Sequence, residues 1–479
     1  MTLPEGWVEA TIDDVADYVS RGKSPKYVDK SSLPVVNQRS VRWSGIEPTH
    51  LKFLDPATAN SWAEERTLRP GDILWNSTGT GTIGRAALFQ QIRGYDRVVA
   101  DSHVTVVRSN AEIVPEYLFN LIRSPAVQDV ISDMQNGSTN QVELARSAVL
   151  GTKVPLPPAA EQRRIVAKLD ALTARLARAR AELDRVPVLA EQLKRSTLIG
   201  AFSGSLTAAW RAENRNAQPV RPRSQDELRS KYRCHEANAE PYLIPNGWRW
   251  LRLPELGDLD RGKSRHRPRN DARLFGGEHP FVQTGDVRAA GQYLTDFSET
   301  YSDFGLAQSR KWPEGTVCIT IAANIAETTV LGISACFPDS VVGFSADDDK
   351  AIPEYIEYFI RTAKADLERF APATAQKNIN LDTLGALAVP TPPVSEQRAI
   401  LSRIDAAFAR ADRMEAEAAS ARALIDRLEA AILAKAFRGE LVPQDPNDEP
   451  AHVLLDRIRA ERAARGATSS RRGRKKAGA

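Results

Sequence analysis

The chain has 479 residues, 42% of them hydrophobic and 26% charged, which excludes a fully disordered or fibrous protein and predicts a folded one. This length exceeds what a single hydrophobic core usually organises, so two domains with connecting elements are expected. The net charge is only +4, so a nucleic-acid-binding role has to come from locally basic segments rather than from the average composition.

From the first residues of the sequence we expect neither a targeting signal nor a membrane anchor. It contains neither the basic segment nor the apolar segment of a signal peptide, and the longest mainly apolar run, 317–326, is too short to span a bilayer. We therefore expect a cytoplasmic protein that does not insert into a membrane. The three cysteines, Cys234, Cys318 and Cys336, are odd in number and widely spaced, which predicts ordinary thiols rather than disulfides or a zinc site.

An internal repeat organises the chain from its first residues onward. The segment 4–25 recurs as 245–265, and each copy carries a Gly-Trp pair near its start and an Arg-Gly-Lys-Ser sequence near its end. Further along, 154–165 recurs as 389–400. The offset between the copies drifts from 241 to 235 residues, so the copies share a framework and differ by insertions and deletions in loops.

Each copy predicts the same order of elements: the Gly-Trp opening, short β-like runs separated by turns, a short helix, a Pro-rich hinge and a long helix. The polar segment that joins the copies predicts a linker with some helix near 226–236, and the strongly basic C-terminal tail is expected to be disordered. The predicted segments are a first globular domain (1–155), a first long helix (156–206), a linker (207–241), a second globular domain (242–390), a second long helix (391–441) and the basic tail (442–479).

Both long helices carry the heptad pattern of coiled coils. Apolar residues follow alternating steps of four and three along 165–186 and along 400–432, and each position in the second helix lies 235 residues from its counterpart in the first. The first seam is rich in Leu and the second in Ala, which favours close packing of large against small side chains. We expect Pro187 to kink the first helix, Ser395 to cap the second and Gly439 to end it.

The sequence contains no recognisable catalytic motif. The prolines of 154–158 lack the Asn or Asp and the aromatic residue of a methyltransferase motif, and 79–85 lacks the Lys-hydroxyl pair of a nucleotide-binding loop. A nuclease-like match, 338–339 with Asp348 and Lys350, is explained more simply by a solvated loop, and the histidines show no metal-ligand spacing. We therefore predict a protein without an active site, metal or cofactor of its own.

Recognition chemistry remains. The dense basic segment 261–273 could neutralise several phosphates of a nucleic acid, although it could also be an ordinary solvated loop. Bases are read by paired hydrogen bonds, chiefly from Arg or Lys to guanine and from Asn or Gln to adenine, and such residues occur at corresponding places in both copies. Each of them alone could instead be a surface or turn residue. The candidate DNA-binding residues are Arg21, Lys23, Gln38, Arg39, Asn76, Ser77, Gln141, Arg261, Lys263, Arg265, Arg267, Gln283, Gln376, Lys377 and Asn378.

These features together resemble one family, the specificity subunits of type I restriction-modification systems, over nearly the whole chain. The sequence Pro-Pro-Ala-Ala-Glu-Gln-Arg at 157–163 and its repeat Pro-Pro-Val-Ser-Glu-Gln-Arg at 392–398 carry the resemblance most strongly. Each precedes a long helix that ends in an Ala-Phe-x-Gly sequence, at 201–204 and 436–439, and Gln-Lys-Asn-Ile at 376–379 fits as well. The first copy departs from the last motif at 140–143, where it reads Asn-Gln-Val-Glu.

The resemblance implies an α+β fold of two target-recognition domains, each reading half of an asymmetric, bipartite site in double-stranded DNA. Two long coiled-coil helices, packed antiparallel, would separate the domains and set the distance between the half-sites. The implied partners are two methyltransferase subunits that bind S-adenosylmethionine, and restriction subunits that translocate DNA with ATP and Mg²⁺. The helix faces outside the seam and the segments after Phe202 and Phe437 are candidates for docking these partners.

Two other functions stay open at this point. The chain could be the specificity module of another restriction class, in which case separate methyltransferase and ATP-driven subunits would not be encoded beside it. It could also be a coiled-coil scaffold without a DNA role. A scaffold predicts no salt-dependent binding to duplex DNA, whereas the basic segment predicts a marked salt dependence.

Overall fold

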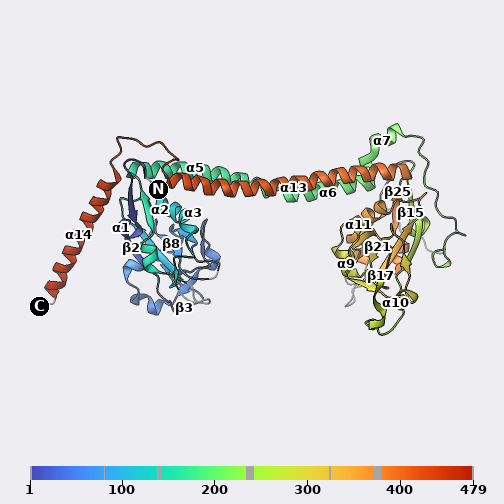
Figure 1. Ribbon diagram of the computed structural model, residues 1–479, viewed down its shortest axis with the longest axis horizontal. Coiled ribbons are helices and arrows are strands. Elements are labelled where there is room, and N and C mark those ends of the chain that lie inside the picture. The colour runs from blue at the N-terminus through green and yellow to red at the C-terminus, as the bar shows by residue number, and fades with distance from the viewer. Residues whose placement is uncertain are drawn as a thin grey trace. The chain divides into compact units, whose positions relative to one another are not determined.

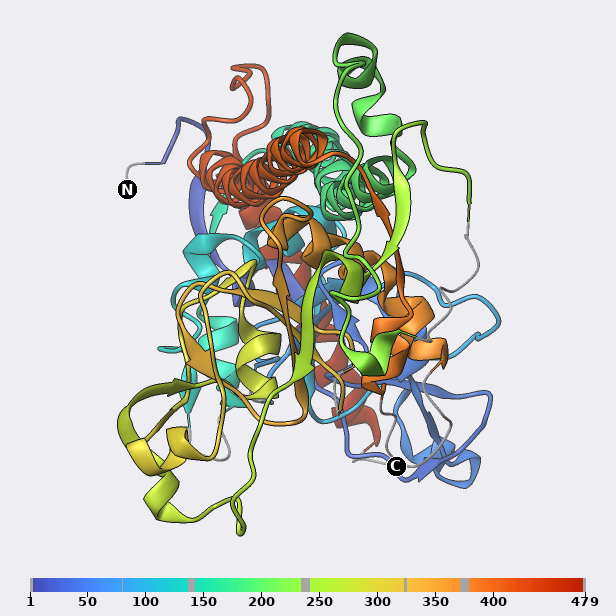
Figure 2. The same cartoon turned by 90° about the vertical axis from the view of Figure 1, so that its right-hand side faces the viewer.

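The computed structural model describes residues 3–79, 81–136, 143–233, 242–322, 325–370 and 379–476 (Figure 1). It divides into two compact units. Unit 1 comprises Met1–Asp184 and Ala419–Ala479, and unit 2 comprises Arg185–Ala418. Within each unit a lobe of short strands and helices is attached to long helices at one of its ends (Figures 1 and 2). No helix in the described part of the chain is long and apolar enough to cross a membrane.

The lobe of unit 1 contains two four-stranded sheets, several two-stranded pairings and short helices. Its strands are β1 (Val8–Thr11), β2 (Ala16–Arg21), β3 (Tyr27–Val28), β4 (Pro34–Val36), β5 (Val41–Arg42), β6 (Gly45–Ile46), β7 (Lys52–Leu54), β8 (Ile73–Asn76), β9 (Ala86–Leu88), β10 (Val99–Ala100), β11 (Val104–Ser109), β12 (Gln135–Asn136), β13 (Glu143–Leu144) and β14 (Lys153–Leu156). Its helices are α1 (Ile12–Val15), α2 (Pro115–Ile122), α3 (Pro125–Gln128) and α4 (Arg146–Leu150). The sheet orders are β2-β11-β8-β9 and β10-β4-β7-β3.

The lobe of unit 2 repeats this plan with a five-stranded and a four-stranded sheet. Its strands are β15 (Arg249–Arg252), β16 (Gly257–Arg261), β17 (Phe275–Phe281), β18 (Tyr293–Leu294), β19 (Glu299–Tyr301), β20 (Lys311–Trp312), β21 (Val317–Thr320), β22 (Thr328–Leu331), β23 (Ala335–Cys336), β24 (Val341–Ala346) and β25 (Ala388–Thr391). Its helices are α8 (Leu253–Leu256), α9 (Thr284–Ala289), α10 (Asp303–Ala307), α11 (Pro353–Phe370) and α12 (Leu381–Gly385). The sheet orders are β16-β24-β21-β22-β18 and β19-β17-β23-β20.

The duplication predicted from the sequence is visible in the strand pairing. The Gly-Trp opening of each copy leads into a strand that pairs antiparallel with the strand just before the hinge, β1 with β14 and β15 with β25. The next strand of each copy, β2 or β16, joins the edge of the main sheet beside β11 or β24. This confirms two mixed α/β domains related by an internal repeat.

The long helices are α5 (Ala159–Leu183), α6 (Val186–Ser203) and α13 (Val394–Phe437). The first long helix is divided into α5 and α6 just before Pro187, because Pro187 has no N–H to continue the helical bonding and its ring crowds the preceding turn. The expected cap at Ser395 is wrong: the carbonyl of Pro393 accepts the N–H groups of Glu396 and Gln397, so the helix begins before Ser395. Gly439 does follow the end of α13, with a left-handed φ of 75°.

The helices pack antiparallel inside each unit. In unit 1, Arg180 of α5 donates 2.7 Å hydrogen bonds to Asp426 and Glu429 of α13. In unit 2, Lys194 of α6 forms a 2.6 Å ion pair with Asp412 of α13. Most seam residues are at least partly buried, whereas Leu428 is half exposed, because the last turns of α13 bury a different face against the lobe.

The C-terminal segment forms a helix, α14 (Ala451–Lys476), so the expectation of a disordered tail is wrong for this segment. Ala451, Leu454, Leu455 and Ile458 are spaced as one helical stripe and are buried in the core of unit 1. Arg459 continues the docking with a 3.3 Å ion pair to Asp14. The apolar stripe is short and lies in a segment rich in Arg, so the composition of the segment did not predict a docked helix.

The predicted linker is also more ordered than expected. It contains a short helix, α7 (Ala208–Glu213), and its Val220 and Tyr232 are buried in the core of unit 2. Leu228 is buried as well. In the described part of 226–236, only a single 3-10 turn (Ser230–Tyr232) forms where a helix was predicted. The segment therefore wraps around the second lobe as part of its core.

Candidate nucleic-acid interface

A buried carboxylate joins each lobe to its long helix. In unit 1, the indole Nε1 of Trp7 donates a 3.0 Å hydrogen bond to Glu161, in the first turn of α5. In unit 2, the indole of Trp248 donates a 2.9 Å hydrogen bond to Glu396, in the first turn of α13. Arg211 pairs with Glu396 as well, at 2.5 Å. The Gly-Trp opening and the Glu of the hinge motif are thus one structural device, used twice.

The glutamine that follows each glutamate completes the joint. Gln162 accepts the backbone N–H of Val114 at 3.0 Å and donates to the carbonyl of Pro157 at 3.1 Å. Gln397 accepts the N–H of Ile352 at 2.9 Å and donates to the carbonyl of Pro392 at 3.0 Å. Each glutamine bonds both the Pro-rich hinge and the residue just before a lobe helix, α2 in unit 1 and α11 in unit 2. These bonds fix the orientation of each lobe relative to the long helix that begins at its hinge.

In each unit, the C-terminal end of a second long helix also packs against the lobe: α13 in unit 1 and α6 in unit 2. Phe437, at the end of α13, contacts Tyr117 of the unit 1 lobe with ring centroids 5.3 Å apart. Phe202, at the end of α6, contacts Tyr355 of the unit 2 lobe at the same distance. Burial raises the pKa of both tyrosines well above its usual value, so both hydroxyls stay protonated and can donate to a backbone carbonyl. Phe202 and Phe437 are both buried, so neither side chain is itself exposed to a partner.

The basic segment of unit 2 lies at the end of the lobe away from α6 and α13, beside α10 (Figures 1 and 2). Arg261 and Arg265 are exposed and Lys263 is half-buried. None of these three side chains has an ion-pair partner among the residues that the structure describes. The segment therefore presents three uncompensated positive charges to solvent.

The other arginines of this segment are already engaged. Arg267 donates 2.7 Å hydrogen bonds to the backbone carbonyls of Ser264 and His266, and Arg269 pairs with Asp339 at 2.8 Å. Arg273 pairs with Asp271 at 2.7 Å, and this contact, with a backbone N–H and His266, holds the pKa of Asp271 well below its usual value. Arg267 therefore shapes the loop, while Arg269 and Arg273 carry locally neutralised charges.

The corresponding residues of unit 1 are placed differently. Arg21 forms a 2.8 Å ion pair with Glu143, and Lys23 donates to the backbone and the hydroxyl of Ser61 at 3.3 Å. Arg39 is exposed and Gln38 is half-buried. The two Arg-Gly-Lys-Ser sequences are thus alike in sequence, yet only the second leaves both of its cations without an acidic partner among the described residues.

Several other predicted residues have internal roles. Asn76 and Ser77 are fully buried: the Asn76 amide donates to the carbonyls of Gln38 and Thr82, and Ser77 bonds the hydroxyl of Thr105. These contacts hold the turn after β8, so neither side chain is exposed in the chain without DNA. Gln283 starts α9 and donates to Glu299 at 2.9 Å. The predicted residues outside the described parts of the chain are Gln141, Gln376, Lys377 and Asn378.

The sequence analysis missed one exposed aromatic residue beside the basic segment. Phe304, in α10, is 44% exposed, and its ring lies next to His266 and Arg273. The available signal was a Phe in a short polar segment, Tyr-Ser-Asp-Phe-Gly, which has no apolar periodicity to bury it. The role of all these residues in DNA binding stays a prediction.

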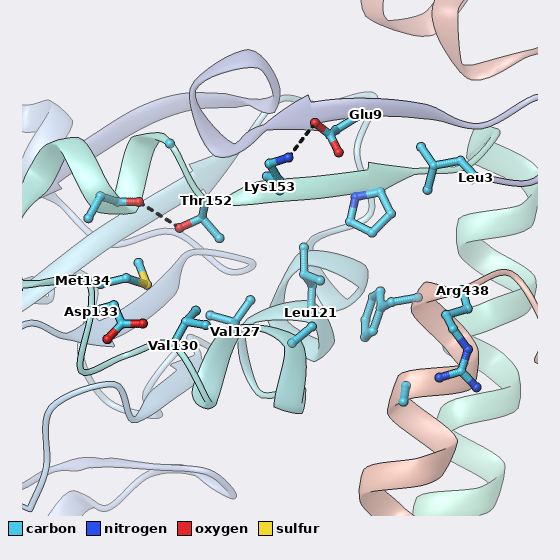
Figure 3. A pocket seen from close by; sticks show the side chains of 16 residues that line it. Leu3, Glu9, Leu121, Val127, Val130, Asp133, Met134, Thr152, Lys153 and Arg438 are labelled. Carbon is cyan, nitrogen blue, oxygen red and sulfur yellow. Dashed lines mark hydrogen bonds and ion pairs between the residues drawn. The ribbon is translucent and has the colours of Figure 1, made fainter. Parts of the chain in front are cut away.

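A cavity of about 690 Å³ lies in unit 1 between β14, α3 and the end of α13 (Figure 3). Its lining is mainly apolar, with Leu121 and Val127 pointing into it. At its edge Lys153 is paired with Glu9 at 3.0 Å, and Arg438 is paired with Glu440 at 2.8 Å. Among the described residues, neither this lining nor any other cluster provides three side chains that could hold a metal.

An α/β lobe that occurs twice in the chain, each time joined to antiparallel helices by the same buried contacts, defines a protein with two equivalent recognition domains. The family model described as the type I restriction modification DNA specificity domain matches this chain twice, over residues 4–185 and 245–419. These matches cover more than half of the chain, and the chain belongs to this family.

Relatives match over nearly the full length. The chain is 27% identical to the type I restriction enzyme EcoKI specificity subunit of Escherichia coli K12 and 24% identical to the StySPI specificity subunit of Salmonella potsdam, each alignment covering 98% of both chains. The fold is similar to that of the HsdS subunit from Thermoanaerobacter tengcongensis, with a TM-score of 0.61, 23% identity and coverage of 92% of this chain and 99% of the other.

Proposed function

We propose that this chain is the DNA-reading subunit of a type I restriction-modification complex, in which each unit reads one half of a bipartite site in duplex DNA. Membership of the specificity family and the duplicated lobes support this assignment. Two lobes with the same frame and different loops suit two unrelated half-sites, because loops can change base preference without disturbing the joint at Trp7 or Trp248.

One observation carries the DNA contact: the cations Arg261, Lys263 and Arg265 belong to the basic segment that is bonded to Gln308 and Ser309, and they have no acidic partner among the described residues. Free cations bind phosphates with an affinity that falls as salt rises, whereas cations paired inside the protein contribute little. Arg39 of unit 1 is exposed too. Exposed Arg side chains can also make the paired hydrogen bonds that identify guanine.

The partners follow from the same proposal. We infer that two copies of one methyltransferase subunit bind S-adenosylmethionine and modify adenines flipped out of the duplex, and that restriction subunits use ATP and Mg²⁺. This chain would then contribute no catalytic group and no cofactor of its own, and it would act on DNA in the cytoplasm.

Equivalent exposed residues support two identical partners. Leu189 of α6 and Leu424 of α13 are 235 residues apart, the same offset that relates the two hinges, and they are 46% and 57% exposed. Leu428 lies one turn from Leu424 on the same helix face and is half exposed as well. Exposed leucines at equivalent positions of a repeat are what two copies of the same protein would recognise.

The test is to co-express this chain with the methyltransferase encoded beside it, in a host that lacks adenine methylation, and to map methylated adenines across the genome by single-molecule sequencing. We expect a two-part motif with a fixed, unspecified gap. A continuous motif would assign the chain to another restriction class. An intact complex that methylates nothing would favour the coiled-coil scaffold.

A further inference from the structure

We propose that Phe304 is an aromatic wedge, which unit 2 inserts between stacked base pairs of the DNA that it reads. This inference rests on the proposed DNA-reading function and adds a mode of contact to it. Phe304 stands in α10, at the end of the unit 2 lobe away from α6 and α13, and 44% of its surface is exposed (Figure 1).

The ring of Phe304 is held in place by polar neighbours. The imidazole of His266 meets it edge-on with ring centroids 5.2 Å apart, and the guanidinium of Arg273 lies 5.1 Å from its centroid. Both neighbours contact Asp271, His266 at 2.8 Å and Arg273 at 2.7 Å. A ring supported in this way keeps its direction while its outer face stays open to solvent.

The basic segment is tied to α10 at several points. The side-chain oxygen of Gln308 accepts the backbone N–H groups of Arg265 at 2.5 Å and of His266 at 3.0 Å. Ser309 donates to the carbonyl of Lys263 at 2.8 Å. The backbone that carries the cations is therefore bonded to the residues just after α10, the helix that carries the ring. In this proposal, DNA bound by the cations also contacts the ring.

The surroundings of Phe304 favour DNA over a protein partner. Lys263 and Arg265, which have no acidic partner among the described residues, lie in the segment whose His266 and Arg273 contact the ring. The one carboxylate next to Phe304 in the sequence, Asp303, is paired with His279 at 2.9 Å. A protein interface needs a contiguous apolar patch with few charges at its centre, whereas a single aromatic ring among cations suits a backbone of phosphates with bases between them.

The energetics are of the right size. Phosphate contacts made by the surrounding cations offset the cost of unstacking one base step. Replacing an aromatic side chain that stacks on a base by alanine typically weakens binding by about 5- to 150-fold. Loss of the ring should therefore weaken binding by about 10-fold, since 1.4 kcal/mol corresponds to a factor of 10.

The experiment uses the complex of this chain with its methyltransferase and a duplex that carries the methylated motif. Dissociation constants are measured by fluorescence anisotropy for wild type, Phe304→Ala, Phe304→Trp and the control Phe297→Ala, whose ring is 38% exposed in the same lobe. We expect Phe304→Ala to bind about 10-fold more weakly, while Phe304→Trp and Phe297→Ala stay close to wild type. The salt dependence should be unchanged in Phe304→Ala, because no cation is removed; a reduced dependence would mean that the loop has collapsed, and would overturn the wedge.

A second measurement places single mismatches along the half-site. At one base step away from the methylated adenine, the wild-type complex should bind a mismatched duplex more tightly than the fully paired one, because a mismatched step is already partly unstacked. Phe304→Ala should lose this preference. Preference for a mismatch at the methylated adenine comes from base flipping by the partner and should survive in the variant. Wild-type affinity in Phe304→Ala, with the same mismatch preferences, would overturn the wedge alone. A wild-type complex without specific binding would overturn both proposals.

Discussion

Trp7 and Glu161 lie 154 positions apart in the sequence, and a 3.0 Å hydrogen bond from the indole Nε1 to the carboxylate joins them. Trp248 and Glu396 repeat this bond in the second unit at 2.9 Å. Both glutamates are buried, so each bond is protected from water and is correspondingly strong. The contacts that attach each lobe to its long helix therefore do not involve the loops of that lobe.

This joint predicts the effect of Trp7→Phe. The substitution keeps the ring and removes the donor, so the buried carboxylate of Glu161 loses a partner and unit 1 should lose about 1.5–3 kcal/mol of unfolding free energy. Hydrogen exchange of the backbone amides in the β1–β14 pairing measures this change. Trp43→Phe is the matched control, because Trp43 is exposed in the same lobe. Equal protection in both variants would contradict the prediction.

The salt dependence of DNA binding should separate free from paired cations. Arg265→Gln should lower the slope of log affinity against log salt by about 0.9, the value for one lost phosphate contact. Arg269→Gln, in the same segment, should leave the slope almost unchanged, because Arg269 is already paired with Asp339. Titrations of the complex at several salt concentrations give both slopes. Equal slopes for the two variants would show that the pairing in the free protein does not decide which cations meet DNA.

The docking of α14 should depend on its apolar stripe. Ile458→Ala removes a fully buried side chain from the core of unit 1 and should cost about 2–4 kcal/mol of local stability. Limited proteolysis should then cut the segment between Phe437 and Ala451 faster than in wild type. Val453→Ala, on an exposed face of the same helix, is the control and should behave as wild type. An unchanged cleavage rate in Ile458→Ala would mean that the ion pairs of α14 suffice to hold it.

Glu357 predicts a pH dependence of stability in unit 2. Its carboxylate is buried in α11, where it accepts hydrogen bonds from Thr328 and Arg361, and burial raises its pKa above the usual value. The folded state therefore binds a proton more readily than the unfolded state, and this group's contribution to stability falls as pH rises from the usual Glu value through the raised pKa.

Glu357→Gln removes this titration. The free energy of unfolding of the variant, relative to that of wild type, should be higher at pH 8 than at pH 5. Urea unfolding at both pH values measures this difference. Glu314→Gln, at an exposed position of the same lobe, controls for the loss of one negative charge. A stability difference that does not change with pH would show that Glu357 keeps the same protonation state in the folded and unfolded chains.

Much of the architecture could be predicted because it depends on patterns within short stretches of sequence. The Gly-Trp openings, the Pro-Pro-x-x-Glu-Gln-Arg hinges and the heptads recur at nearly constant offsets, so the duplication and the long helices could be read directly. The break at Pro187 follows from the chemistry of proline. The stripe of Leu454 and Ile458 has helical spacing too, but so few apolar residues did not outweigh the basic composition around them.

The functional surface depended on contacts between residues far apart in the sequence. Whether a cation of the basic segment is free was decided by Asp339, 70 positions from Arg269, and whether Asn76 faces solvent was decided by the carbonyl of Gln38, 38 positions away. The sequence by itself determined the repeat, the hinges and the helices, because periodicity and backbone restriction act within a few residues. Only the tertiary structure decided which polar side chains are bonded inside the protein and which remain exposed, because hydrogen bonds and ion pairs form between whatever groups the fold brings together.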